Sequence, residues 1–154
     1  MEEDKIRWCS KQKKGIELIE SKPHLYESYM KEAEEDFDEL SSAGEKWKAI
    51  IAYYSCYEAF YSLLMKCGIR CEIHDCSLEL MGLFDFTEED LNYIKSLKKA
   101  REGNQYYLKR NSLKKKERIK QFISKCKEIS SELNSDKIMQ IRKRIENITN
   151  KNRK

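Results

Sequence analysis

The sequence predicts an all-α protein, an up-and-down bundle of four to six helices. The 154 residues include only one proline and five glycines, so the residues that usually mark β-turns are scarce. Leu, Ile, Lys, Glu and Ser are abundant instead, which is typical of long helices joined by short turns. The chain has the length of one ordinary domain with a hydrophobic core. We therefore expect residues 1–154 to form a single domain.

Apolar side chains at helical spacing define the elements of the first half of the chain. They predict a first helix over residues 4–20 and a second helix that starts at Pro23, a residue suited to the first turn. The outer face of the second helix is acidic between residues 32 and 39. Residues 45–67 are apolar almost all round, which is typical of a helix at the centre of a bundle, or of one with one face in the core and another against a second subunit. Their aromatic stripe predicts packing rather than ligand binding. Glu58 interrupts this central helix, and we expect a tyrosine hydroxyl or a basic residue beside it.

Capping residues mark the elements of the second half. Gly68 is suited to end the central helix, and residues 73–84 predict a short helix. Thr87 precedes three acidic residues, a pattern that predicts the start of a fifth helix running to residue 108 with a bend at Gly103. A further helix begins near Ser112. A break at residues 134–136 then introduces a basic C-terminal extension, residues 136–154, which keeps a helical period.

The charge of the chain is distributed unevenly. Residues 109–154 carry sixteen lysines and arginines against five acidic residues, a net charge of +11, whereas residues 1–108 have a net charge of −7. This asymmetry is typical of a surface for nucleic acid or an acidic partner, but also of a solvated face in a lysine-rich protein. No run of about 18 apolar residues predicts a membrane span, and no secretory signal is expected. These observations favour a cytoplasmic protein.

Six cysteines raise the question of disulfides and metals. In a cytoplasmic protein the default expectation is reduced thiols, although a hyperthermophilic source would weaken it. Zinc accepts the ligand types found at Cys67, Cys71, His74 and Cys76. Those four residues crowd a single turn, whereas structural zinc sites usually use two separated pairs. We therefore expect neither a metal nor another cofactor.

The stretch from Gly68 to Cys76 contains the first candidate site. Arg70 and His74 are four residues apart, so one helical turn would bring them side by side. A neutral imidazole can take a proton from an RNA 2′-hydroxyl, and a guanidinium can stabilise the charge that develops on the phosphate. This chemistry makes Arg70 and His74 candidate catalytic residues. The alternative is that His74 forms local hydrogen bonds while Arg70 pairs with a surface carboxylate.

A second group of residues is suited to holding phosphates or base edges. Arg101 begins a stretch that mixes a guanidinium, amides and phenols, and a run of lysines follows it. The alternative is a polar seam between helices. The candidate nucleic-acid- or nucleotide-binding residues are Arg101, Asn104, Tyr107, Lys114, Lys115 and Lys116.

The order of these features resembles the HEPN superfamily, in particular its UPF0332-like branch of small archaeal and bacterial proteins. The resemblance covers about residues 30–110. An Ala-Tyr-Tyr element at residues 52–54 leads to a Gly-Ile-Arg turn at residues 68–70 and then to His74. The other matching residues are those from Ala33 to Leu40, Trp47, Phe60, Leu63, Leu64, Lys66, Arg101, Tyr106 and Tyr107.

This resemblance implies a helical bundle that forms a homodimer through its central helices. Many relatives are ribonuclease toxins or RNA-associated modules, often paired with a small nucleotidyltransferase that acts as antitoxin. Ribonuclease members place four to six residues between an Arg and a His, whereas three residues separate Arg70 from His74. Our hypothesis is an RNA- or nucleotide-binding protein, with metal-independent RNA cleavage as its catalytic form. The alternative is a non-catalytic partner subunit of a small nucleotidyltransferase.

Overall fold

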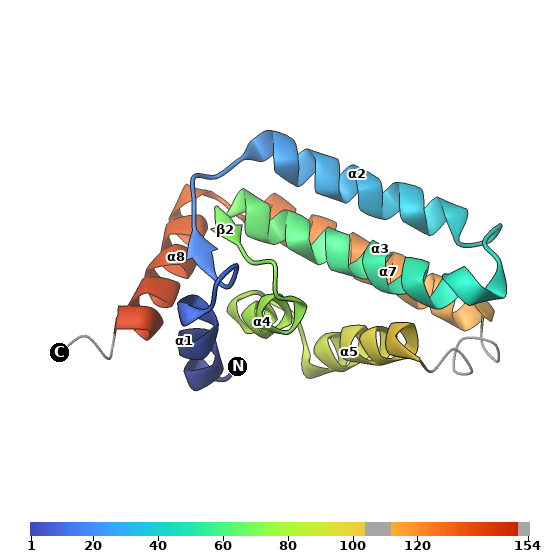
Figure 1. The fold of residues 1–154 in the computed structure, drawn as a ribbon. Coiled ribbons are helices and arrows are strands. Elements are labelled where there is room, and N and C mark those ends of the chain that lie inside the picture. The colour runs from blue at the N-terminus through green and yellow to red at the C-terminus, as the bar shows by residue number, and fades with distance from the viewer. Residues whose placement is uncertain (104–111, 151–154) are drawn as a thin grey trace.

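The computed structural model describes residues 1–103 and 112–150, without the side chains of residues 112–115 (Figure 1). The all-α prediction is confirmed: the described ranges contain seven α-helices, one short 3-10 helix and a sheet of two short strands. The helix count exceeds the expected four to six because the basic C-terminal extension forms a helix of its own. No helix in the described ranges combines the length and apolar character needed to cross a bilayer.

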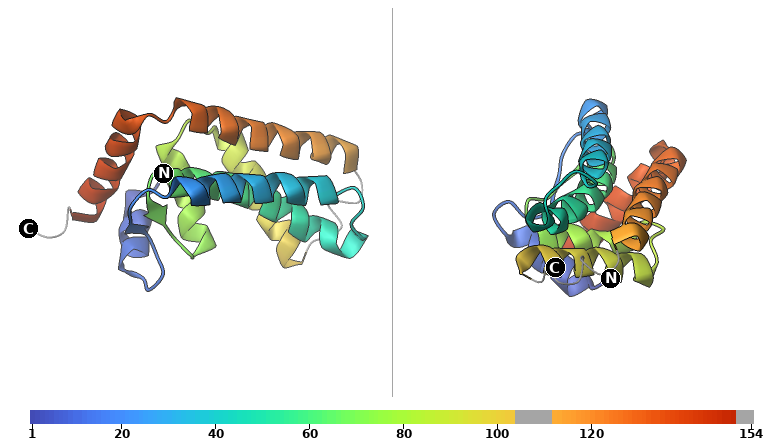
Figure 2. Two further views of the ribbon diagram at one scale, coloured as in Figure 1. Left: turned by 90° about the horizontal axis from the view of Figure 1, so that it is seen from above. Right: turned by 90° about the vertical axis from the view of Figure 1, so that its right-hand side faces the viewer.

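Three long helices run side by side: α2 (Pro23–Glu39), α3 (Glu45–Lys66) and α7 (Ser112–Glu132) (Figures 1 and 2). Helix α3 lies at the centre, and α5 (Glu88–Glu102) also packs against it. Most side chains of α3 are buried, as expected for a helix that is apolar all round. The prediction that this segment is the core of the bundle is therefore confirmed.

The shorter elements gather at one end of the bundle (Figure 1). Helix α1 (Glu3–Lys11) packs against α4 (His74–Glu79) and against α8 (Ser135–Asn150). A 3-10 helix (Leu80–Leu83) continues α4. The short helix predicted over residues 73–84 is thus present in two parts.

The predicted first helix over residues 4–20 is wrong beyond Lys11. The chain folds back so that Ile16 N–H donates to the Cys9 carbonyl at 3.1 Å. A Cβ on Gly15 would lie 1.9 Å from that carbonyl oxygen, so the turn requires glycine there. The chain then forms strand β1 (Glu17–Leu18), which pairs antiparallel with β2 (Ile69–Arg70). The helical spacing of the apolar residues did not predict this turn.

The end of α3 confirms the role expected for Gly68, which has a φ of 70°. Arg142 of α8 donates to the carbonyls of Ile19, Cys67 and Gly68 at 2.8, 3.0 and 2.8 Å. These bonds include one to the carbonyl of Cys67, the C-cap residue of α3, which the end of the helix leaves without a helical partner. They also hold the C-terminal helix against the domain. The predicted break before α8 is present, with the Asn134 side chain accepting from Lys137 N–H at 2.9 Å.

Helix α5 begins where the sequence predicts. The Thr87 hydroxyl accepts from Asp90 N–H at 3.1 Å, and the Asp90 carboxylate accepts from Thr87 N–H at 2.9 Å, which forms a capping box. Asp90 also pairs with Arg118 and Lys125 of α7, at 2.9 and 2.5 Å. One carboxylate therefore caps α5 and joins it to α7. The described part of α5 ends at Gly103, and the predicted continuation to residue 108 lies outside the described residues.

The sequence predicts a tyrosine hydroxyl or a basic residue beside Glu58, but the structure places a second carboxyl group there. Asp36 of α2 shares a hydrogen bond with Glu58, and the Oε2 atom of Glu58 is buried without a hydrogen-bond partner in the described structure. Burial raises the pKa of Glu58, and the hydrogen bond and charge of Asp36 raise it further, followed by the charge of Glu32. Glu58 is therefore held in its protonated form well above the ordinary pKa of 4.5.

We expect Glu58→Gln to stabilise the protein at pH 8 by roughly 1–3 kcal/mol, the cost of an uncompensated buried polar group. The folded state binds a proton that the unfolded state releases above pH 4.5, so wild-type stability should fall as pH rises above that value. Gln supplies the hydrogen-bond donor without taking up a proton. Urea unfolding between pH 5 and 8 measures the effect, with Asp38→Asn, which changes an exposed acid on the neighbouring helix α2, as control. Equal pH dependence in wild type and Glu58→Gln would contradict the assignment.

Candidate functional site

His74 is the first residue of α4, and its ring is half-buried against α3. Its Nδ1 atom lies 2.7 Å from the Tyr53 hydroxyl oxygen. The ring also stacks on Tyr57, with centroids 4.1 Å apart and an angle of 6° between the planes. Two side chains of the central helix thus fix both the position and the rotation of the imidazole.

A row of stacked tyrosine rings on α3 positions residues 71–77, the segment that contains His74. Tyr53, Tyr57 and Tyr61 recur every four residues and stack in sequence. The Tyr57 hydroxyl donates to Ser77 Oγ at 3.0 Å, and the Tyr61 hydroxyl accepts from Cys71 N–H at 3.1 Å. All three rings are buried, which confirms that the aromatic stripe packs in the core.

Arg101 of α5 brings a positive charge to the same place. Its Nη1 donates to the Tyr54 hydroxyl at 3.0 Å, and its guanidinium lies over the rings of Tyr53 and Tyr54, at 4.7 and 5.5 Å from their centroids. Its ion pair with Glu102 is long, at 4.0 Å. The charge of Arg101 is therefore held in place by aromatic groups and is only weakly compensated by that carboxylate.

Lys98 lies one helical turn before Arg101, and its charge is compensated more fully than that of Arg101. Its Nζ pairs with Asp75 of α4 at 2.9 Å and with Glu102 at 2.9 Å. Two carboxylates thus compensate its charge. Lys98 mainly ties α5 to the beginning of α4, next to His74.

Burial and these cations determine the charge of His74. Burial lowers the pKa of the imidazole below its ordinary value of 6.5, the charges of Arg101 and Lys98 lower it further, and Asp75 opposes them. His74 is therefore neutral at pH 7. Burial also raises the pKa of Tyr53 above its ordinary value, which outweighs the opposing charge of Arg101. The phenol therefore keeps its proton.

The structure does not give Arg70 the same surroundings as His74. Arg70 is exposed on β2 and pairs with Glu17, its register partner on β1. That hydrogen bond is the main reason that the pKa of Arg70 is raised, with smaller contributions from Glu72 and Tyr61. The alternative weighed for Arg70, pairing with a surface carboxylate, is the arrangement found. A catalytic role for Arg70 and His74 stays a prediction.

The remaining candidate residues fall in different places. Asn104 and Tyr107 lie outside the described residues, and Lys114 and Lys115 belong to the first turn of α7 without described side chains. The Lys116 ammonium contacts the Ser41 hydroxyl and lies 5.7 Å from the centre of the Phe37 ring. Among the candidates with described side chains, the structure thus brings Arg101 to His74 and places Lys116 near the end of α2.

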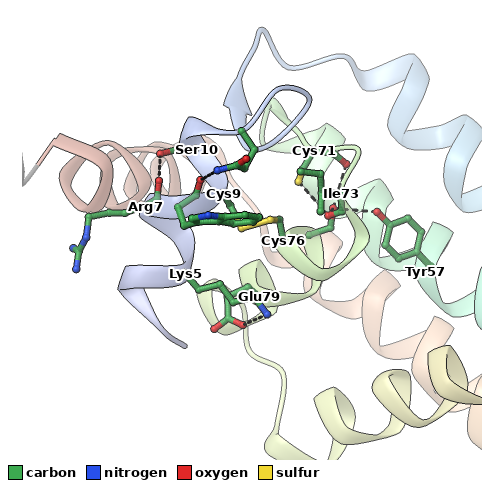
Figure 3. The surroundings of a disulfide bond; sticks show 12 residues. Lys5, Arg7, Cys9, Ser10, Tyr57, Cys71, Ile73, Cys76 and Glu79 are labelled. Carbon is green, nitrogen blue, oxygen red and sulfur yellow. Dashed lines mark hydrogen bonds and ion pairs between the residues drawn. A yellow bond between two sulfur atoms is a disulfide. The ribbon is translucent and has the colours of Figure 1, made fainter.

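Cys9 and Cys76 form a disulfide that links α1 to α4 (Figure 3). The default expectation of reduced thiols is wrong for this pair, because the fold-back at Gly15 and the position of α4 bring two distant cysteines together. Cys56, Cys67, Cys71 and Cys126 are free and buried. Across the described ranges, no group of three or more His, Cys, Asp or Glu side chains could hold a metal ion.

Sequence reasoning missed the side chains that complete the site, above all Tyr53 and Lys98. Tyr53 belongs to a stripe that correctly predicts packing, and nothing in the sequence indicates which buried hydroxyl meets an imidazole. A neutral imidazole with one ring nitrogen engaged, beside a fixed guanidinium, can bind an anionic oxygen such as that of a phosphate. Comparisons of the chain with protein-family models, with curated proteins and with solved structures found no match.

Proposed function

We propose that the protein is a HEPN-type RNA- or nucleotide-binding protein of the cytoplasm that holds a phosphate between His74 and Arg101. One observation carries the proposal: the Arg101 guanidinium is fixed over two tyrosine rings beside a neutral imidazole. Guanidinium and imidazole N–H groups are ordinary phosphate donors in RNA-binding sites. The Tyr54 ring is half-buried at the same site, so it can also contact a base, as aromatic side chains do in proteins that bind single strands.

The resemblance and the charge distribution support the same proposal from a different direction. Proteins with the matching element order are often homodimers that act on RNA. The net charge of +11 over residues 109–154 provides cations for further phosphate contacts. In this proposal RNA binds through the fixed site at His74, and the basic C-terminal part adds affinity that depends on salt concentration.

We expect Arg101→Ala and His74→Ala each to weaken binding of a labelled single-stranded RNA by about 10- to 100-fold, the usual effect of losing a charge-assisted hydrogen bond. Arg101→Ala should also reduce the dependence of log Kd on log salt concentration by about one unit. Fluorescence anisotropy at several salt concentrations measures both effects.

Matched controls exist for each variant. His24 is the second histidine and is exposed on α2, and Arg7 lies on α1, where it pairs with Asp4 and Glu3. His24→Ala and Arg7→Ala should bind as the wild type does, and equal losses in them would contradict the site. Gel analysis of the same RNA in chelator tests cleavage separately: products lost with His74→Ala but kept with His24→Ala would support a ribonuclease.

A further inference from the structure

We propose that Tyr53 is a positioning residue that fixes the tautomer of His74: its hydroxyl donates to Nδ1, so the imidazole proton resides on Nε2. His74 then offers an N–H donor to a bound anionic oxygen and is not a proton acceptor at that nitrogen. The spectroscopic part of this inference stands alone, whereas its consequence for RNA rests on the proposed function.

The burial of Tyr53 is the first step. The side chain is 0% exposed, so its hydroxyl cannot bond to bulk water. A buried O–H group without an acceptor loses its hydrogen bonds to water without compensation, and such groups are rare in folded proteins. Within the described structure, Nδ1 of His74, at 2.7 Å, is the acceptor available to this hydroxyl.

The protonation states of the two groups are the second step. The phenol stays protonated because burial raises its pKa, and the imidazole stays neutral because burial and nearby cations lower its pKa. A neutral imidazole has one N–H donor and one acceptor nitrogen. If Nδ1 accepts a hydrogen bond from the phenol, then Nε2 must carry the ring hydrogen. The opposite tautomer would leave the Tyr53 hydroxyl proton without an acceptor.

Packing opposes a rotation of the His74 ring that would change which atom faces Tyr53. Rotation of the imidazole by a half-turn would replace Nδ1 by a carbon and break the bond to Tyr53. The ring is also stacked on Tyr57 at 4.1 Å. Tyr57 is itself held by its hydrogen bond to Ser77, whose Oγ donates in turn to the Cys71 carbonyl at 3.2 Å. The ring orientation is therefore determined from two sides.

The consequence for the site is a division of roles. Arg101 supplies charge, and His74 supplies a neutral, directed hydrogen bond, a use of imidazole that enzymes also make when they polarise a substrate oxygen. An imidazole that carries its proton on Nε2 cannot take a proton there from a 2′-hydroxyl. In this tautomer the site holds RNA by its phosphate and does not start cleavage with His74 as the base.

Nitrogen-15 NMR of the two histidine side chains tests the inference, because the chain contains only His24 and His74. At pH 7.5 we expect the His74 pattern of a single Nε2–H tautomer. His24→Ala assigns the signals. Tyr53→Phe keeps the aromatic ring but removes the hydroxyl, so the Nδ1–H form should become populated. Tyr61→Phe removes a buried hydroxyl from the same face of α3 without touching His74, and it should leave the His74 pattern unchanged.

Two results would overturn the inference: a wild-type His74 with its proton on Nδ1, or a His74 pattern that is the same in Tyr53→Phe. Addition of a short single-stranded RNA tests the link to function. We expect the Nε2–H signal of His74 to shift while the signals of His24 stay in place. A single Nε2–H tautomer without an RNA-induced shift would retain the role of Tyr53 and contradict the RNA site instead.

Discussion

Reduction of the Cys9–Cys76 disulfide is expected to lower the free energy of unfolding by about 4 kcal/mol. The two cysteines are 67 residues apart in sequence, and the loop between them contains α2 and α3. In the chain-entropy description, a cross-link over so long a loop removes many conformations of the unfolded chain. Both sulfur-bearing side chains are fully buried between α1 and α4, so the bond also holds α1 against the helix that begins with His74.

Urea unfolding with and without a thiol reductant measures this contribution. The double variant Cys9→Ala/Cys76→Ala is the control, since it should match the reduced wild type and should not respond to reductant. Identical unfolding curves for the wild type in both conditions would contradict the prediction. Hydrogen exchange adds a local readout, because the amides of α1 should lose more protection on reduction than those of the α2–α3 pair.

Asp90→Ala is expected to destabilise the protein by about 3 kcal/mol, the lower end of the range for breaking a buried ion pair. Asp90 is 4% exposed and bonds to three residues at once. It forms the capping box of α5 with Thr87 and binds the cations of Arg118 and Lys125. Its loss leaves two cations of α7 without their carboxylate. We take the lower end because both cations are partly exposed and can be rehydrated.

The pH dependence of stability gives Asp90 a separate signature. Burial alone would raise its pKa, but the hydrogen bonds from Lys125, Thr87 and Arg118 outweigh burial and lower the pKa to about 2. The unfolded value is 3.8, so this stabilisation is complete above that pH and is lost as pH falls toward 2. Asp90→Asn should flatten the acid limb of the stability curve. Asp85→Asn changes an exposed acid in the preceding loop and should leave that limb unchanged.

Local chemistry explains why several helix ends could be predicted from the sequence. Gly68, Thr87 and Asn134 each satisfy backbone groups within a few residues of themselves, so their effect is visible in a short window of sequence. The predicted helix over residues 4–20 failed for the opposite reason. Its stripe of apolar residues continues past Lys11, but the chain turns at Gly15 to meet β2, which lies about fifty residues further along.

The sequence by itself determined the helical class, the buried central segment and the presence of a histidine next to its end, because composition and periodicity are properties of neighbouring residues. Tertiary structure decided which arginine meets His74. Packing of α5 against α3 brings Arg101 to the imidazole, whereas the β1–β2 pairing engages Arg70 with Glu17. It likewise decided that Tyr53 meets Nδ1 and that Cys9 meets Cys76. Such contacts depend on how distant segments pack, and a linear pattern does not contain that information.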